Sequence, residues 1–197
     1  MAEILLYENR SVKTYLVKDS KFGKPVIKKV HVKDQIADSD SLEFKFELEL
    51  LQSLPYKGIQ RGLGIETENG KPALYYDYYD GFSIKQLIKS NQLDLKKTLQ
   101  IIKGVAEVLA TLHEIKLIHK NINSHSILVN TETWEVQIID FSHANKINNR
   151  IGRRTYQRLC LIILKISVND ISDFFMIYTL IFFYSLLHKK LIRKKPS

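Results

Sequence analysis

The sequence predicts an α+β fold in which a small antiparallel sheet with one helix precedes a mostly helical region. Two observations predict this order. Short apolar segments separated by polar turns fill the first third of the chain, and a long helical repeat follows Asp94. A hydrophobic content of 45% in 197 residues agrees with a globular core. The single cysteine, Cys160, allows no internal disulfide and no metal-site spacing, so packing must supply the stability.

The first part of the chain reads as β-β-β-α-β-β. Strands are expected at 4–8, 12–18 and 26–32. Between 41 and 54 the period becomes helical, with Phe44, Leu48 and Leu51 at positions i, i+4 and i+7, and Pro55 ends the helix. Two further strands are expected at 59–66 and 73–79, joined by a turn that contains Asn69 and Gly70.

The second part reads as two helices and a small hairpin. A short helix is expected at 83–90, and a long helix begins after Asp94, a residue type that caps helix N-termini. A row of apolar residues with helical spacing predicts the buried face of the long helix: Leu95, Leu99, Ile102, Ala106, Leu109 and Leu112. The apolar stretches 127–129 and 136–139 predict the hairpin.

Residues 118–129 read Ile-His-Lys-Asn-Ile-Asn-Ser-His-Ser-Ile-Leu-Val and resemble the catalytic loop H-R-D-L-K-P-x-N-I-L of protein kinases. Residues 139–142, Ile-Asp-Phe-Ser, resemble the D-F-G segment of the same family, and residues 25–28, Pro-Val-Ile-Lys, stand at the V-A-I-K position. The resemblance implies a protein-kinase-like fold with a five-stranded antiparallel N-lobe, a helix C and a partial helical C-lobe.

The same resemblance divides the chain into an N-lobe at 1–80, a partial C-lobe at 81–150 and an apolar, basic tail at 151–197. No A-P-E segment follows Asn145, so the C-lobe is expected to be truncated. The residues of the two motifs also resemble those of a narrower group. Its members are bacterial multidomain signalling proteins that place a kinase-like domain ahead of an ATPase module and a sensor histidine kinase.

The resemblance implies ATP and Mg²⁺ as ligands. Lys28 would contact the α- and β-phosphates while paired to Glu47. Lys29 points to the opposite face of the strand and becomes the candidate if the register slips by one residue. Glu43 and Glu49 remain alternatives to Glu47 on the same helix.

The resemblance also assigns the remaining ligand contacts. Asp140 would bind Mg²⁺, with the hydroxyl of Ser126 as a weak second ligand. Adenine would lie against the main chain of Asp77 to Tyr79. Three side chains complete the expected adenine pocket, with apolar covers from Val17 and Leu128 and a back wall from Tyr76.

Several departures from the family pattern argue against catalysis. Asn121 stands where the family has its catalytic aspartate, and an amide cannot accept a proton at neutral pH. Asn123 replaces the loop lysine. The three glycines of the glycine-rich loop are replaced, which hinders close approach of the backbone to phosphates; the replacing residues are Tyr7, Asn9 and Val12.

These substitutions predict a pseudokinase with weak ATP and Mg²⁺ binding and a signalling role through an unidentified protein partner. Two alternatives stay open. One is a weakly active Ser/Thr phosphotransferase that uses Asp140 and Mg²⁺, and the other is a membrane-associated fragment.

Charge and hydropathy of the tail bear on partners and localisation. Residues 151–197 hold nine Lys/Arg and two Asp/Glu, a net charge of +7 out of +9, so a general nucleic-acid-binding face is not expected. The apolar run 174–187 would form a helix of about 21 Å, short of a bilayer span. The tail is a buried core helix, a membrane-surface contact through 159–195, or unrelated sequence. No secretory signal is recognised, so a cytoplasmic location is expected.

Overall fold

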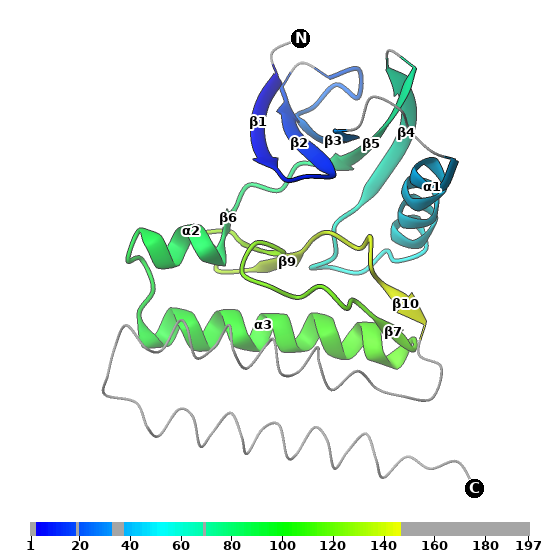
Figure 1. The fold of residues 1–197 in the computed structure, drawn as a ribbon. Helices are drawn as coiled ribbons and strands as arrows, with labels where there is room; N and C mark the ends of the chain where they lie inside the picture. Colours follow the sequence, from blue (N-terminus) through cyan, green and yellow to red (C-terminus); the bar gives the residue numbers. More distant parts are fainter. Residues whose placement is uncertain (1–2, 19, 33–37, 69, 147–197) are drawn as a thin grey trace, which may run out of the picture.

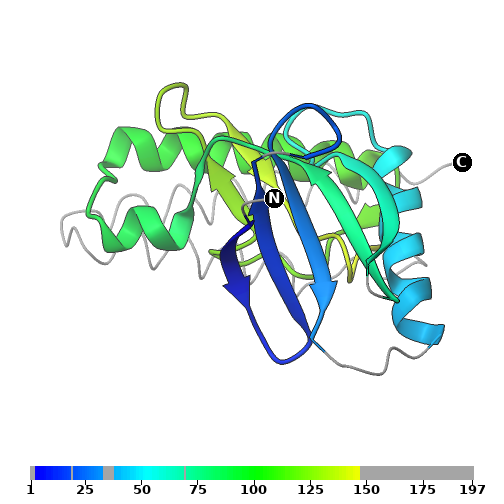
Figure 2. The same cartoon turned by 90° about the horizontal axis from the view of Figure 1, so that it is seen from above.

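A computed structural model describes residues 3–18, 20–32, 38–68 and 70–146 of the chain. Its upper part is a curved sheet with one helix beside it, and its lower part contains two helices and short strands (Figure 1). Seen from above, the helix α1 (Asp38–Gln52) lies along one edge of the sheet (Figure 2). All three interpretations of the tail 151–197 fall outside the described residues.

The upper sheet has five antiparallel strands in the order β1-β2-β3-β5-β4. Their bounds are Glu3–Glu8, Val12–Val17, Val26–His31, Lys71–Asp77 and Gly62–Glu68, in that spatial order. The predicted fold class, an α+β chain with a five-stranded antiparallel N-lobe, is confirmed. β4 begins three residues later than expected, because Ile59 pairs with Ile138 in a separate bridge.

The two faces of β3 have different neighbours. Val26 and Val30 pack with apolar side chains on the outer face of the sheet. Ile27 packs against the main core, and His31 stacks on Phe44 of α1 at 4.2 Å between ring centroids. Because side chains alternate along a strand, Lys28 belongs to the outer face and Lys29 to the inner face.

The helix α1 spans Asp38–Gln52 and packs against the sheet through Phe44, Leu48 and Leu51. It starts three residues before the predicted start at 41 and ends two residues before the predicted end at 54. Its packing needs Gly62 on β4, where an added Cβ atom would lie 2.8 Å from Leu48 Cδ1 and 3.3 Å from Leu51 Cβ. The glycine therefore sets how closely α1 approaches the sheet.

Residues 58–60 connect the upper sheet to the lower part of the molecule. The main chain of Gln60 donates to the Ile138 carbonyl at 3.0 Å, and Ile138 donates to the Gly58 carbonyl at 2.8 Å. Gly58 has a positive φ of 82°, and a Cβ atom there would lie 2.4 Å from Val108 Cγ2. A side chain at position 58 would therefore strain the backbone and push into the helix that contains Val108.

The lower part begins with β6 (Phe82–Ser83), α2 (Ile84–Lys89) and α3 (Leu95–Glu114). Ser83 and Gln86 form a capping box at the start of α2, and the Asp94 side chain caps α3 by accepting from the main-chain N–H of Lys97. Both predicted helices are present, and the predicted cap at Asp94 is confirmed.

The predicted buried face of α3 is partly wrong. Leu95 and Leu99 are 45% and 46% exposed. The buried residues of this helix are Thr98, Ile101, Val105, Val108, Leu109 and Leu112. The helix carries two apolar rows with the same period, and periodicity alone cannot say which of them packs against β9.

Short strands complete the lower part. β8 (Ile127–Val129) and β9 (Val136–Ile138) form the predicted hairpin, and β6 joins them as a third strand. β7 (Leu117–Ile118) pairs with β10 (Asn145–Lys146). These pairings hold the segments before and after the hairpin beside each other.

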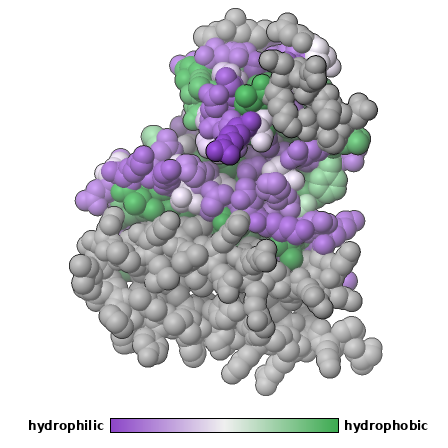
Figure 3. All heavy atoms as spheres, viewed as in Figure 1, coloured by the Kyte–Doolittle hydropathy of each residue, from purple (hydrophilic) through white to green (hydrophobic). Residues whose placement is uncertain are grey.

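Apolar surface is visible over β1 and α1 (Figure 3). The exposed large apolar side chains there are Ile4, Leu5, Leu6 and Tyr7 on β1, and Leu42 and Phe46 on α1. Within the described residues, no helix has the length and apolar character needed to cross a bilayer.

Candidate functional site

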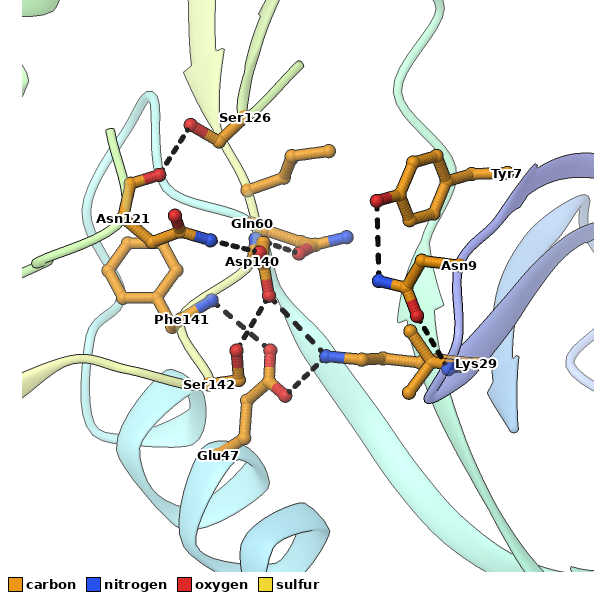
Figure 4. A network of polar contacts seen from close by, with 12 residues as sticks. Tyr7, Asn9, Lys29, Glu47, Gln60, Asn121, Ser126, Asp140, Phe141 and Ser142 are labelled. Atoms are coloured by element: carbon orange, nitrogen blue, oxygen red, sulfur yellow. Dashed lines mark hydrogen bonds and ion pairs between the residues drawn. The ribbon is translucent and has the colours of Figure 1, made fainter. Parts of the chain in front are cut away.

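The inner face of the sheet meets the lower part of the molecule at a network of ion pairs, in which Lys29 and Glu47 are buried and Asp140 is half-buried (Figure 4). Lys29 Nζ lies 3.0 Å from Glu47 Oε2 and 3.5 Å from Asp140 Oδ1. Burial opposes the charge of Lys29, but the two carboxylates outweigh it and raise its pKa. The network joins β3, α1 and the segment after β9, which are far apart in the sequence.

The predicted pairing of Lys28 with Glu47 is wrong, and Lys29 makes this pair instead. Lys28 lies on the outer face, where its ammonium contacts Glu3 and Glu68. The choice of Glu47 over its neighbours agrees with the geometry, because Glu47 is 0% exposed and reaches Lys29, while Glu43 and Glu49 are exposed. The register slip that the sequence left open is the one the fold adopts.

The same slip affects the expected adenine pocket. Val17 lies on the outer face with Val26, Ala73 and Tyr75, so its expected role as a cover of the nucleotide is also wrong. The residues that share the inner face with Lys29 on neighbouring strands are Thr14 and Leu74, its direct partners. Neither of these two residues is among those expected from the sequence to line the adenine pocket.

The other expected pocket residues lie nearer to the network. Tyr76 is fully buried on the inner face, paired with Ile27, and burial together with the Glu47 carboxylate raises its pKa well above the ordinary value. Leu128 is half-buried in β8. β5 ends at Asp77, so the main chain of Tyr78 and Tyr79 leaves the sheet ladder, and the Tyr79 hydroxyl donates to the Glu135 carbonyl at 2.9 Å.

Asp140 is held from several sides. Asn121 Nδ2 donates to its Oδ2 at 2.8 Å, and Ser142 Oγ donates to its Oδ1 at 2.8 Å. Its main-chain N–H donates to Gln60 Oε1 at 3.3 Å. Burial disfavours ionisation, but Lys29 and these hydrogen bonds outweigh it, so the pKa of Asp140 lies below its ordinary value. The residue has a φ of 67°, in the left-handed region that aspartate tolerates.

The segment after Asp140 is tied to the helix. The main-chain N–H of Phe141 donates to Glu47 Oε1 at 3.2 Å, so Glu47 binds a cation with one oxygen and the backbone with the other. The Phe141 ring is fully buried and meets the His119 ring edge to face at 4.6 Å. Glu47 therefore fixes the position of residues 140–142 relative to α1.

His119 anchors the catalytic-loop-like segment rather than facing a ligand. Its Nε2 lies 3.0 Å from the Ile139 carbonyl, and the main-chain N–H of Asn121 donates to its Nδ1 at 3.2 Å. These partners require a neutral ring protonated at Nε2. Burial lowers the pKa of His119 to about 4.

Asn123 and Ser126, the two other replaced residues of the loop, form their hydrogen bonds within the loop. Asn123 Nδ2 donates to the Asn121 carbonyl at 2.9 Å, and the Ser126 hydroxyl donates to the same carbonyl at 3.0 Å. The Ser126 hydroxyl also accepts from the main-chain N–H of Asn123 at 2.9 Å. Ser126 is 2% exposed, so the segment 121–126 forms a closed hydrogen-bond network.

The turn between β1 and β2 lies opposite this network (Figure 4). Asn9 Oδ1 accepts from the main-chain N–H groups of Ser11 and Val12, both at 2.8 Å. Asn9 Nδ2 donates to the Tyr7 hydroxyl at 3.3 Å. The Tyr7 ring also approaches the His125 ring, with 6.0 Å between centroids, so Tyr7 connects the turn to the loop below it.

The arrangement does not fit the expected Mg²⁺ site. A magnesium ion takes oxygen ligands in octahedral geometry. Here both Asp140 oxygens accept hydrogen bonds, and the Asn121 amide presents its NH₂ group to one of them, because the reverse orientation would place its oxygen against the carboxylate. Ser126 is turned into its own loop. The described residues contain no cluster of three or more His, Cys, Asp or Glu side chains that could hold a metal ion.

Comparison with known proteins identifies the chain. The family model described as protein tyrosine and serine/threonine kinase matches residues 10–163. The chain is 32% identical over 115 residues to a putative G-type lectin S-receptor-like serine/threonine-protein kinase of Arabidopsis thaliana, covering 55% of this chain and 14% of that protein. It is 29% identical over 136 residues to a probable serine/threonine-protein kinase of Dictyostelium discoideum, covering 66% of this chain and 32% of that protein.

A human relative, mitogen-activated protein kinase kinase kinase 5, is 30% identical over 105 residues, which cover 51% of this chain and 8% of the relative. The chain thus spans a third or less of the length of these relatives. Because the family model matches more than half of the chain, and the fold places Lys29, Glu47 and Asp140 together, the protein belongs to the protein tyrosine and serine/threonine kinase family.

Proposed function

We propose that this protein is a pseudokinase, a kinase-family domain that does not transfer phosphate and acts in signalling through an interaction with another protein. The proposal includes the two lobes bounded at residues 80 and 150, and an origin in a larger signalling protein of the bacterial multidomain type. The membrane-associated alternative depends on 159–195, outside the described residues.

One observation carries the proposal. At the position of the general base, Asn121 donates its amide N–H to Asp140 instead of presenting an acceptor to a substrate hydroxyl. A general base must accept a proton, and a neutral amide has no such capacity near pH 7. Loss of a general base lowers a rate by about 10² to 10⁴. Asn123, in place of the loop lysine, adds no positive charge to offset this loss.

The nucleotide part of the proposal depends on the preserved half of the site. Lys29, held by Glu47, has the place and partner that a phosphate-binding lysine requires in this family. Adenine would bind to the main chain after Asp77, where the chain leaves the sheet; Tyr76 is fully buried beside it, and Leu128 is half-buried in β8. Weak ATP binding is therefore expected, with the ligand contributing little to stability at low concentration.

A phosphotransfer assay tests the proposal. The purified full-length chain is incubated with Mg²⁺ or Mn²⁺ and ATP labelled in its γ-phosphate, alone and with generic protein substrates. No transfer above that of an Asp140→Ala variant is expected. Transfer that exceeds the Asp140→Ala background, and disappears in a Lys29→Met variant, would overturn the pseudokinase assignment.

The same assay addresses the runner-up function, a weakly active Ser/Thr phosphotransferase. The intact contacts of Lys29 with Glu47 and Asp140 favour this alternative, because they are the part of the kinase site that positions phosphates. It predicts slow transfer that rises when Asn121→Asp supplies a carboxylate at the base position. A rate that stays at background in Asn121→Asp would exclude it.

A further inference from the structure

The β1–β2 turn faces the loop residues Asn121 and Asp140 (Figure 4), and the space between them is called the cleft below. One asparagine lies on each side of it: Asn9 in the β1–β2 turn, and Asn121 in the loop after β7. Each amide hydrogen-bonds to groups that would otherwise bind phosphate or a metal ion. Together they decide which part of a nucleotide the cleft can recognise.

Asn9 acts on the N-terminal side. Main-chain N–H groups of a tight turn are the donors that cradle phosphate oxygens when nothing else accepts from them. Here the N–H groups of Ser11 and Val12 are both satisfied at 2.8 Å by Asn9 Oδ1. A phosphate would have to displace this carbonyl to reach either donor, which cancels most of the hydrogen-bond gain.

Asn121 acts on the C-terminal side. Its Nδ2 donates to Asp140 Oδ2 at 2.8 Å, while Ser142 and Lys29 lie against Oδ1. Oδ2 keeps a second lone pair, but a cation there would lie beside an NH₂ group that offers it no lone pair. The carboxylate therefore has a protein partner on each oxygen, and the residue next to it adds no ligand for a cation.

Charge completes the argument. The network contains one cation, Lys29, and two carboxylates, the buried Glu47 and the half-buried Asp140, for a net charge of −1. Without a metal ion, a triphosphate that approaches Lys29 also approaches this excess negative charge, which repels it. Lys29 occupies the place of the family's phosphate-binding lysine, but two carboxylates offset its charge, so without a metal ion it adds little net attraction for a phosphate.

We propose that Asn9 and Asn121 replace the phosphate and the cation in this cleft, so that it recognises an adenine nucleoside and gains no affinity from phosphates or Mg²⁺. The inference rests on the proposed nucleotide-binding function and specifies its ligand. Adenosine is the probe ligand, held by the main chain that follows Asp77 and by the apolar side chains around it.

Calorimetric titration of the full-length chain tests the inference. Adenosine, AMP and ATP are each titrated in millimolar Mg²⁺ and again in EDTA. All six dissociation constants are expected to agree within about threefold, because no described group rewards the phosphates or the metal. ATP in Mg²⁺ binding tenfold or more tightly than adenosine would overturn the inference and leave the nucleotide-binding function standing.

Two substitutions of the exposed residue Asn9 test its role. Asn9→Ala frees the N–H groups of Ser11 and Val12 and should tighten ATP relative to adenosine by about tenfold. Asn9→Asp keeps an acceptor for the same N–H groups and adds a negative charge, so it should give no such gain. If Asn9→Ala and Asn9→Asp prefer ATP over adenosine by the same factor, then Asn9 does not keep phosphates from the N–H groups of Ser11 and Val12.

Asn121→Asp replaces the amide donor with a second carboxylate beside Asp140, and two carboxylates are a ligand set for a hard cation. ATP binding by this variant should become tighter in Mg²⁺ than in EDTA. Asn91→Asp, which adds the same charge in the exposed loop between α2 and α3, is the matched control and should remain indifferent to Mg²⁺. Indifference of Asn121→Asp as well would overturn the role of Asn121.

The two proposals fail in different ways. If the unsubstituted chain binds none of the three ligands but an Asn9→Ala/Asn121→Asp chain binds ATP with Mg²⁺, the nucleotide-binding function is wrong and the role of the two asparagines is supported. Circular dichroism checks that both chains are folded. If neither folded chain binds any of the ligands, both proposals are overturned.

Discussion

Lys28 and Lys29 are adjacent on β3, and each is held by two carboxylates, yet only one of them belongs to the candidate site. Lys28 lies on the outer face with Glu3 and Glu68, which are side chains of β1 and β4, the two edge strands of the same sheet. Lys29 lies on the inner face, and its partners come from α1 and from the segment after β9. The outer lysine connects strands of one sheet, whereas the inner lysine connects three separate parts of the fold.

The difference shows that a pair of carboxylates around a lysine does not by itself mark a functional site. What distinguishes Lys29 is the burial of its partner and the distance along the chain from which its partners come. Glu47 is 0% exposed, while the side chains of Glu3 and Glu68 are 34% and 40% exposed. The outer carboxylates remain hydrated without their lysine, and the inner one does not.

The largest expected effect comes from removing each lysine in turn. Lys29→Met should reduce the free energy of unfolding by about 3–5 kcal/mol, because it leaves the Glu47 carboxylate buried without a counter-charge. Lys28→Met should reduce it by about 1 kcal/mol at most, because its partners can turn to water. Urea unfolding of the two variants beside the unsubstituted chain gives both values.

A double substitution separates pairing from packing. Glu47→Gln keeps an oxygen that can accept from Phe141 N–H and removes the charge, so Lys29→Met/Glu47→Gln should recover part of the stability lost in Lys29→Met. Similar losses for Lys28→Met and Lys29→Met, with no recovery in the double variant, would mean that the two faces of β3 do not differ in the way described.

Most of the fold could be predicted from the sequence, because its elements are local. Strand alternation, the cap at Asp94, and the hairpin after Ile127 all follow from short-range patterns. The choice between Lys28 and Lys29 could not be predicted, because each of the two alternating sets on β3 contains one lysine and each set has buried residues. The buried row of α3 was ambiguous for the same reason, since two apolar rows share one helix.

A second prediction uses pH to compare the inner region with the rest of the molecule. Burial lowers the pKa of His119 to about 4 in the folded protein, against an ordinary value of 6.5. Between these values the unfolded chain binds the proton and the folded chain does not. Stability that is present above pH 6.5 should therefore be lost as the pH falls toward 4, by about 3 kcal/mol in all.

Urea unfolding at several values between pH 7 and pH 4 measures this loss. His119→Gln keeps a hydrogen-bond donor but cannot titrate, so its stability should depend less on pH. His113→Gln is the matched control, because burial also lowers the pKa of His113 but that side chain is only half-buried. A pH dependence that is unchanged in His119→Gln would show that the acid sensitivity arises outside the inner region.

The candidate site was predictable in its residue types and less so in its contacts. The motifs identified Glu47, Asn121 and Asp140, and these three residues meet around Lys29. Two hydrogen-bonding roles could not be predicted from the sequence. Asn9 accepts from main-chain N–H groups of its own turn, and Ser142 donates to Asp140. Both depend on which rotamer a small polar side chain adopts once the backbone around it is fixed, and several acceptors compete for it.

The smallest expected effect concerns how tightly α1 must lie on the sheet for Glu47 to reach Lys29. Gly62→Ala places a methyl group 2.8 Å from Leu48 Cδ1 and 3.3 Å from Leu51 Cβ, so α1 must shift, at about 1–2 kcal/mol. Gly64→Ala, two residues along the same strand, meets no atom within 4 Å and should be neutral or slightly stabilising. Thermal unfolding of both variants measures the difference.

Because the shift carries Glu47 away from Lys29, Lys29→Met should destabilise the Gly62→Ala background less than the Gly64→Ala background. Equal effects of Lys29→Met in the two backgrounds would mean that the ion pair tolerates movement of α1, and that the position of the helix does not control the inner face of β3.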